Sequence, residues 1–355
     1  MNTLKSYRSF FALLVCGSIV ALLGCGEGGV EASALPDASV AQDTAVVVHF
    51  DAESMNPDNL RAAAMALLDA VPEESAQQRE MAVAEIDKNL AEYRTLYDDM
   101  VERGAEAMTM AIAVTGGGPE EGALLVRTRT GADLGQIREA INTFSTARGD
   151  SMPEEVTLER LDDSWAYFTG DDELVSPEGG SAEVTESFRQ ALDDVPGGMK
   201  LAFRMTEAIK AEFAGESQNA PPMLIGLMGP MQQLDFAVIG VTTGASPTAT
   251  AQMRFADEQS AGAFLQAWNG LIQMGKGMAQ GQLAQMPNPP SNDAINGLFD
   301  ALSMTQDGGT LSMSLDQQFV QSVGEIAPAA MPMIMGGLGG GMGPGGPGGM
   351  GGGGY

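Results

Sequence analysis

Two long stretches of this chain, residues 44–177 and 178–326, repeat the same order of hydrophobic patterns. Apolar residues at every second position predict strands, and apolar residues three or four apart predict helices. Each stretch is typical of a strand, a helix, a long hairpin, a second helix and a final hairpin. An offset of 124 residues matches Asp133 with Asp257 at the start of the second helix. The recurrence predicts a duplicated architecture; the alternative is a chance similarity of two α/β segments.

The first stretch begins with a strand at 44–50, and Asn56-Pro57 then caps a helix. The most regular helix is expected at 74–103, with Gly104 as its C-terminal cap. Its heptad seam consists of Val83, Ile86, Leu90, Tyr93, Tyr97 and Met100. The seam packs either on its own domain or in a coiled-coil contact with a partner or a second copy, the last of which would make the chain a homodimer.

Turn and capping residues place the remaining elements. Asp133 and Asp257 each precede a helical pattern, and Asp-rich turns separate the strands of both final hairpins. The expected hairpin strands are 108–114 with 124–130, 156–161 with 165–169, 234–242 with 248–255, and 303–306 with 310–315. Asp307-Gly308-Gly309 is the strongest of the turn signals.

The predicted fold is therefore α+β, with two tandem strand-helix-hairpin-helix-hairpin units. Each unit is expected to form its own antiparallel sheet with helices on one face. The expected domain order is a signal peptide at 1–24, a flexible tether at 25–43, the first unit at 44–177, the second unit at 178–326, and a tail at 327–355. The tail is mostly Gly, Met and Pro, a composition that predicts disorder.

The N-terminus predicts export. Lys5 and Arg8 precede the apolar run 10–23, which is the layout of a secretory signal. As a helix the run would extend about 21 Å, short of the roughly 20 residues that a bilayer span needs. It is therefore expected to be removed rather than to serve as an anchor.

Leu22-Leu23-Gly24-Cys25 at the end of this run resembles the lipobox of bacterial lipoproteins. The resemblance covers only residues 1 to about 26, and nothing in the body resembles a family that we can name. It implies cleavage before Cys25, acylation of this cysteine and attachment to a membrane through the lipid. In the lipoprotein class, Asp after the cysteine favours retention in the inner membrane. Gly26 at this position therefore implies delivery to the outer membrane in a cell with two membranes, facing the periplasm or the cell surface. The alternative is an ordinary signal peptide that ends in a chance cysteine.

Charge and cysteine content exclude several functions. The formal net charge of −29 repels nucleic acid, so no nucleic-acid partner is expected. Cys16 would leave with the signal and Cys25 would carry lipid, which leaves the body without a thiol. Disulfides, thiolate catalysis and cysteine-ligated metals are therefore not expected.

No complete catalytic set can be recognised. His49 is the only histidine, and without a Gly-x-Ser-x-Gly elbow it is interpreted as a sheet histidine satisfied by its neighbours. The segment 270–276 is similar to the start of a phosphate-binding loop, but Gly277 replaces the hydroxyl residue and a helix surrounds it. Two minor hypotheses are calcium at 171–173 and Cu(I) at the methionines of the tail. No cofactor and no metal are predicted.

The leading hypothesis is a non-enzymatic, lipid-anchored envelope protein that binds a protein, a glycan or an apolar ligand. The alternative is a carboxylate-based hydrolase of envelope polysaccharide, which needs a groove with two acidic side chains facing each other about 5 to 10 Å apart. A third hypothesis is a structural role with dimerisation through the 74–103 helix. A groove lined only by apolar residues would favour binding over hydrolysis.

Overall fold

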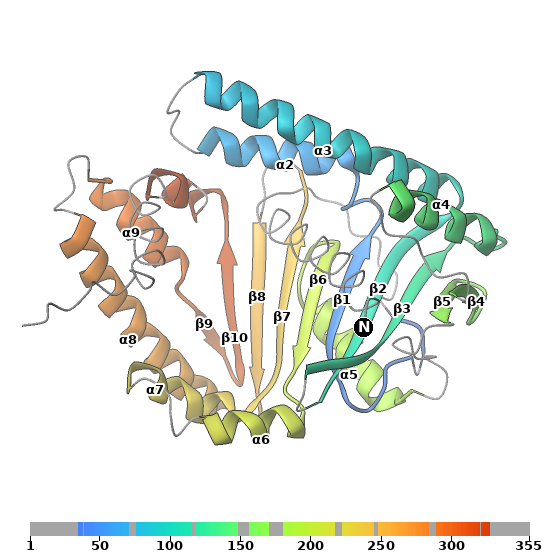
Figure 1. Cartoon of the computed structure of the whole chain (residues 1–355). Coiled ribbons are helices and arrows are strands. Elements are labelled where there is room, and N and C mark those ends of the chain that lie inside the picture. The colour runs from blue at the N-terminus through green and yellow to red at the C-terminus, as the bar shows by residue number, and fades with distance from the viewer. Residues whose placement is uncertain are drawn as a thin grey trace, which may run out of the picture.

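The computed structural model describes residues 35–37, 39–70, 76–115, 118–147, 156–169, 180–216, 222–244, 248–283, 289–319 and 321–326. They build one ten-stranded antiparallel sheet in the order β4-β5-β3-β2-β1-β6-β7-β8-β10-β9, with helices packed around it (Figure 1). The mixed α/β character and the antiparallel pairing were both predicted.

The elements follow one another along the chain with these bounds. They are β1 (Thr44–Asp51), α2 (Pro57–Ala70), α3 (Ala76–Glu102), β2 (Ala105–Thr115), β3 (Gly118–Thr128), α4 (Leu134–Ala147), β4 (Thr157–Arg160), β5 (Trp165–Thr169), α5 (Ala182–Asp193), β6 (Met199–Arg204), α6 (Glu207–Glu216), α7 (Pro222–Met231), β7 (Leu234–Thr242), β8 (Thr248–Phe255), α8 (Glu258–Leu283), α9 (Asn292–Ala301), β9 (Thr305–Asp307) and β10 (Thr310–Leu315).

The predicted caps are present at the helix starts. Asn56 Oδ1 accepts the Asp58 N–H at 2.8 Å, Asp133 Oδ1 accepts the Gly135 N–H at 2.9 Å, and Asp257 Oδ1 accepts the Ser260 N–H at 2.7 Å. Each bond satisfies a backbone donor that the first helical turn leaves free. Gly104 follows α3 with φ of +99°, the left-handed conformation expected at a helix end.

The sequence prediction of two separate sheets is wrong. β1 and β6, the first strands of the two predicted units, pair antiparallel, with His49 opposite Lys200 and Val48 opposite Leu201. This pairing joins both halves into one sheet, because each first strand satisfies the backbone groups that would otherwise lie on an open edge. Outward from this pair, the strand order is β2-β3-β5-β4 on one side and β7-β8-β10-β9 on the other.

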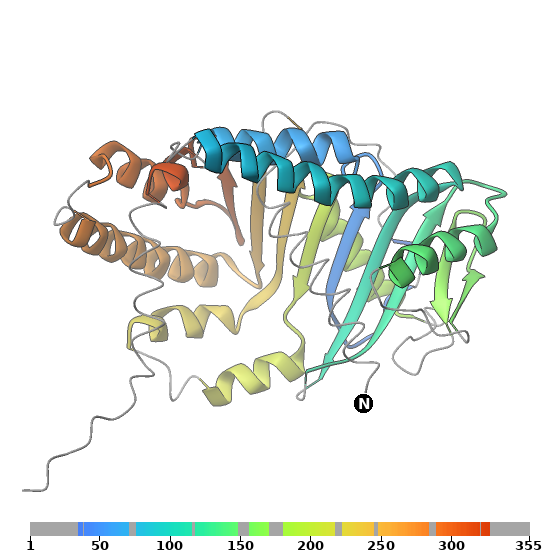
Figure 2. The same cartoon turned by 45° about the horizontal axis from the view of Figure 1, so that its top comes forward.

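Helices cover both faces of the sheet, so the prediction of helices on one face is also wrong. α3, α4 and α6 to α8 pack on the face that carries Val126 and Phe203, which we call the front face. α5, which the sequence analysis missed, packs on the opposite face, which we call the α5 face (Figures 1 and 2). Ser181 caps α5 through the Val184 N–H. Both faces of the central strands carry apolar side chains, so helices pack on each face.

The core under α5 draws residues from both halves of the chain. Phe188 is fully buried, and its ring meets Phe236 of β7 edge-on at 5.1 Å between centroids. The same cluster includes Val47 of β1, Ala111 of β2 and Leu125 of β3. α5 therefore ties the strands of the first half to those of the second.

The predicted flexible tether extends too far. Leu35 and Val40, inside the predicted range 25–43, are buried in the cluster beneath α5. The Val40 N–H donates to Thr185 Oγ1 at 3.0 Å, and the Ser181 N–H donates to the Val40 carbonyl at 2.8 Å. Burial and hydrogen bonding of this backbone fix it to the α5 face.

Several predicted features lie outside the described residues. They are the signal peptide with Cys25, the acidic segment 171–173 and the tail 327–355. Within the described ranges, no helix is long and apolar enough to cross a membrane.

Candidate functional site

An unbroken row of apolar side chains crosses the front face at right angles to the strands. Strand register places these residues directly opposite one another on seven consecutive strands, and paired residues share a face. From β3 to β10 the row consists of Leu124, Met110, Val48, Leu201, Ile239, Ala251 and Met313. We call these seven residues the apolar row.

The apolar row is less buried than its surroundings. None of its seven residues is fully buried, and Leu201, on a central strand of a ten-stranded sheet, is 38% exposed. On the side of α2, the adjacent row is largely buried, including Phe50, Met199 and Val241. On the other side, Phe203 packs against the cluster formed by α6 to α8. An antiparallel sheet can have one face in water, but helices pack on both faces of this sheet, so the exposure of Leu201 shows that their cover is incomplete at the row.

Helices lie at both ends of the central strands and leave the apolar row between them. α2 and α3 cross the end where β1 finishes, and α6 and α7 lie at the opposite end (Figures 1 and 2). With strands about 4.8 Å apart, the row is about 29 Å long. The row carries no charged, hydroxyl or amide side chain. Its chemistry is therefore apolar contact alone.

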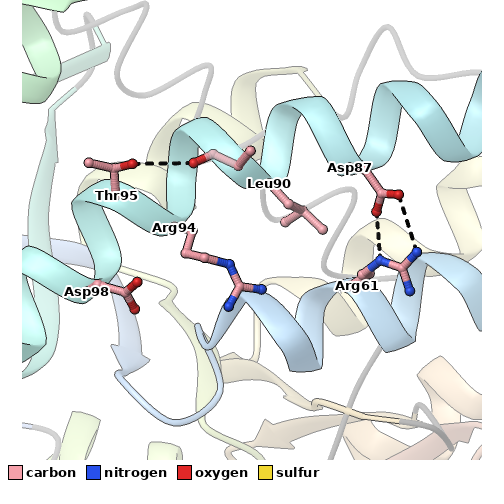
Figure 3. A pocket seen from close by; sticks show the side chains of 7 residues that line it. Arg61, Asp87, Leu90, Arg94, Thr95 and Asp98 are labelled. Atoms are coloured by element: carbon pink, nitrogen blue, oxygen red, sulfur yellow. Dashed lines mark hydrogen bonds and ion pairs between the residues drawn. The ribbon is translucent and has the colours of Figure 1, made fainter.

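A small groove of 320 Å³ lies on the outer surface of the α2–α3 pair. Figure 3 shows Arg61 of α2 directed at Asp87 of α3, with Nε to Oδ1 at 2.6 Å. Arg94 of α3 pairs in the same way with Asp58. Hydrogen bonds from these arginines hold the pKa of Asp87 and that of Asp58 below their ordinary values.

These ion pairs do not favour the polysaccharide hydrolase. Its general acid needs a carboxyl group with a raised pKa, held protonated at neutral pH. Asp87, which lines this groove, and Asp58, the partner of the lining residue Arg94, are instead kept ionised by their arginine partners. The groove is interpreted as the packing seam of two exposed helices.

His49 lies on the α5 face and is a structural histidine, as predicted. Its Nδ1 is 2.8 Å from Thr109 Oγ1, and the ring is buried. Burial, with Arg127 and Lys200 adding positive charge nearby, lowers the pKa of His49 to about 3. The ring is therefore neutral at physiological pH.

We expect the His49 ring to stay neutral well below the usual histidine midpoint. In the folded chain its NMR signals should not shift between pH 8 and about pH 4.5, whereas the urea-unfolded chain should titrate near 6.5. Because only the unfolded chain binds this proton between about pH 6.5 and pH 3, His49 lowers the stability of the fold as pH falls through this window, by up to about 1.4 kcal/mol per pH unit. A folded-state midpoint near 6.5 would contradict the buried environment.

The segment 270–276 is part of a continuous helix, as the sequence indicated. It lies inside α8, and the residues directly before it are helical rather than a strand, so its backbone N–H groups are used within the helix. Lys276 Nζ lies 3.2 Å from Asp300 Oδ1. The similarity to a phosphate-binding loop is therefore coincidental.

The heptad seam of α3 is partly used inside the chain. The Tyr93 hydroxyl donates to the Met55 carbonyl at 2.9 Å, and burial raises the pKa of Tyr93. Met100 is buried with α4 against the front face. Near the start of α3, in contrast, Met81 is 62% exposed.

No metal centre is visible in the described parts of the chain, where no three His, Cys, Asp or Glu side chains converge. The apolar row was not predicted from the sequence. The available signal was the Val46-Val47-Val48 run, which places apolar side chains on both faces of β1. Apolar residues on both faces of a strand predict that other elements or a ligand pack on each face.

Comparison with known proteins leaves the family open. No family model matches this chain, and no curated protein matches it. Two solved structures, crystal forms III and IV of TP0453, are similar to it with TM-scores of 0.34 and 0.32 and identities of 9% and 10%. The alignments cover 81% and 84% of this chain and 97% and 99% of those chains. Similarity at this level carries no argument about function.

Proposed function

We propose that this chain is a non-enzymatic, lipid-anchored envelope protein that binds a hydrocarbon chain along the apolar row. The observation that supports the proposal is the partly exposed, uninterrupted row itself, with its most exposed residue, Leu201, at the centre. Water on such a surface is unfavourable, and burial of apolar area stabilises a complex by roughly 25 cal/mol per Å². The row's length of about 29 Å exceeds the roughly 15 Å that one acyl chain spans in half of a bilayer core.

A hydrocarbon chain matches the apolar row better than a peptide strand or a glycan does. The backbone groups of β1, β6 and β7 are already paired within the sheet, so an added peptide strand would find no partners. A glycan would lose hydrogen bonds to water and gain none, because the row has no polar side chain. A hydrocarbon chain has no such groups to satisfy.

Direct titration tests this function. The chain beginning at Gly26, which keeps every residue that the structure describes, is titrated with pyrene-labelled dodecanoic acid below its micelle concentration. We expect saturable binding of one probe per chain, with unlabelled palmitate as a competitor. A soluble sugar fragment or a peptide that competes equally would contradict the proposed ligand class. Absence of saturable binding would overturn the proposed function.

The proposed anchor has its own test. Intact mass of the protein expressed in a bacterial host should reveal an acylated chain that starts at Cys25, found in the outer-membrane fraction. The Cys25→Ala variant should lose the acyl mass and leave the membrane fraction. Cys16→Ala, which changes the other cysteine within the signal, is the matched control and should remain anchored. A soluble, unacylated wild-type chain would contradict the anchor.

We also propose that the two halves of the sheet arose by duplication. The proposal is supported by the strand order, in which β1 to β5 occupy positions equivalent to β6 to β10 on either side of the β1–β6 pair. In both halves, helices follow the first strand and a further helix follows the hairpin. The apolar row crosses the centre of this arrangement at Val48 and Leu201.

A further inference from the structure

Two of the seven residues in the apolar row are methionines. Met110 lies on β2 and Met313 on β10, on opposite sides of Leu201, and both are partly exposed on the front face. A thioether packs as an apolar group, yet its sulfur reacts with strong oxidants when it is accessible. The proposed binding surface therefore contains two oxidisable positions.

We propose that Met110 and Met313 are modification sites whose oxidation by a hypohalous acid releases the bound hydrocarbon chain. The inference rests on the proposed function, and it identifies a means of regulating the same surface. In the reaction, the sulfur lone pair takes the oxygen atom of hypochlorous acid and the thioether becomes a sulfoxide. Sulfur loses two electrons, chlorine is reduced to chloride, and one proton is released.

The sulfoxide changes the one property on which binding depends. It places a strongly polar S=O group on a row that offers no hydrogen-bond donor from its side chains. A hydrocarbon chain that covers this group would strip its water without replacing the hydrogen bond. Binding should therefore weaken, while strand pairing, which involves only backbone groups, is preserved.

The composition of the chain leaves methionine as the sensitive group. Its two cysteines are Cys16 in the signal and Cys25 at the proposed lipidation site, so the body has no thiol to intercept the oxidant. Met274 and Met278 on α8 are 40% and 54% exposed and lie outside the sheet. They react under the same conditions without touching the row, which makes them matched controls.

The test compares probe binding before and after oxidation. The chain beginning at Gly26 is treated with hypochlorous acid, freed of oxidant, and titrated with pyrene-labelled dodecanoic acid, while peptide mass spectrometry locates each sulfoxide. We expect about a tenfold or larger rise in Kd, with sulfoxide at Met110 and Met313. The Met110→Leu/Met313→Leu variant, a volume-conserving change, is compared with itself, and its Kd after treatment should equal its own Kd before treatment. Met274→Leu/Met278→Leu should lose affinity as wild type does.

Three results would overturn the inference. The first is an equal loss of affinity in the Met110→Leu/Met313→Leu variant. The second is sulfoxide confined to positions outside the row. The third is unchanged affinity in a chain oxidised at both row positions. In each of these cases the untreated chain still binds the probe, so the proposed function stands; absence of binding before treatment would instead overturn both. Circular dichroism and thermal melting of each sample distinguish release from unfolding.

Discussion

Leu201→Asp should abolish most hydrocarbon binding while leaving the fold intact. Leu201 is the central residue of the apolar row and is 38% exposed, so an aspartate there keeps its water in the free protein. A bound chain would strip that water from a carboxylate that has no partner on the row. We expect Kd for pyrene-labelled dodecanoic acid to rise about 100-fold, equivalent to about 2.7 kcal/mol.

Ser314→Asp provides the matched control for this result. Ser314 is exposed on β10 opposite Thr250, and it faces away from the row. The Ser314→Asp substitution introduces the same charge into a strand of the same sheet, and Kd should change by less than about twofold. Equal losses in both variants would indicate a charge effect on the whole chain rather than contact with Leu201.

Phe188→Ala should strongly destabilise the fold. The ring is fully buried beneath α5, meets Phe236 edge-on, and lies 6.0 Å from the Arg204 guanidinium carbon. Truncation of a buried phenylalanine removes its transfer free energy and leaves a cavity. We expect the free energy of unfolding to fall by about 4 kcal/mol in urea titrations.

The shape of that transition matters as much as its midpoint. Since α5 packs on strands of both halves, the whole sheet should unfold in one transition at lower urea. Met278→Ala, at a side chain that is 54% exposed, should leave the midpoint nearly unchanged. A Phe188→Ala transition that splits, with one half retaining its wild-type midpoint, would show that the halves fold as separate domains.

Local signals in the sequence predicted most of the elements correctly. Period-two patterns marked the strands, and short polar side chains marked the helix starts at Asn56, Asp133 and Asp257. These signals work because a cap or a turn depends on a few neighbouring residues, whose geometry is fixed by their own backbone. The turn at Gly308, with φ of +55°, is a further example.

The joining of the two halves was not predictable in the same way. Val48 and Leu201 are about 150 residues apart, and nothing in either strand specifies its partner. α5 was missed although Val184, Phe188 and Leu192 recur every four residues and are all buried against the sheet. That spacing could have predicted the helix α5 from the sequence, whereas the face of the sheet on which α5 packs depends on the complete sheet.

The candidate site depended on tertiary structure alone. Seven residues from seven strands form the apolar row, and only strand register brings them into line. The exposure of Leu201 also could not be inferred from its neighbours, because Met199 on the same strand and face is buried. Helix placement around the sheet decides which of these similar residues meets solvent.

The most direct test of the account is methyl NMR of the chain beginning at Gly26 with spin-labelled stearic acid. Paramagnetic broadening should be strongest for the Val48, Leu201 and Ile239 methyl signals and weaker for Val47 and Val238, whose side chains lie on the α5 face. Reduction of the spin label should restore the broadened signals. Broadening that is stronger on the α5 face, or at Leu90 of the α2–α3 groove, than along the row would contradict the central claim that the apolar row is the binding surface.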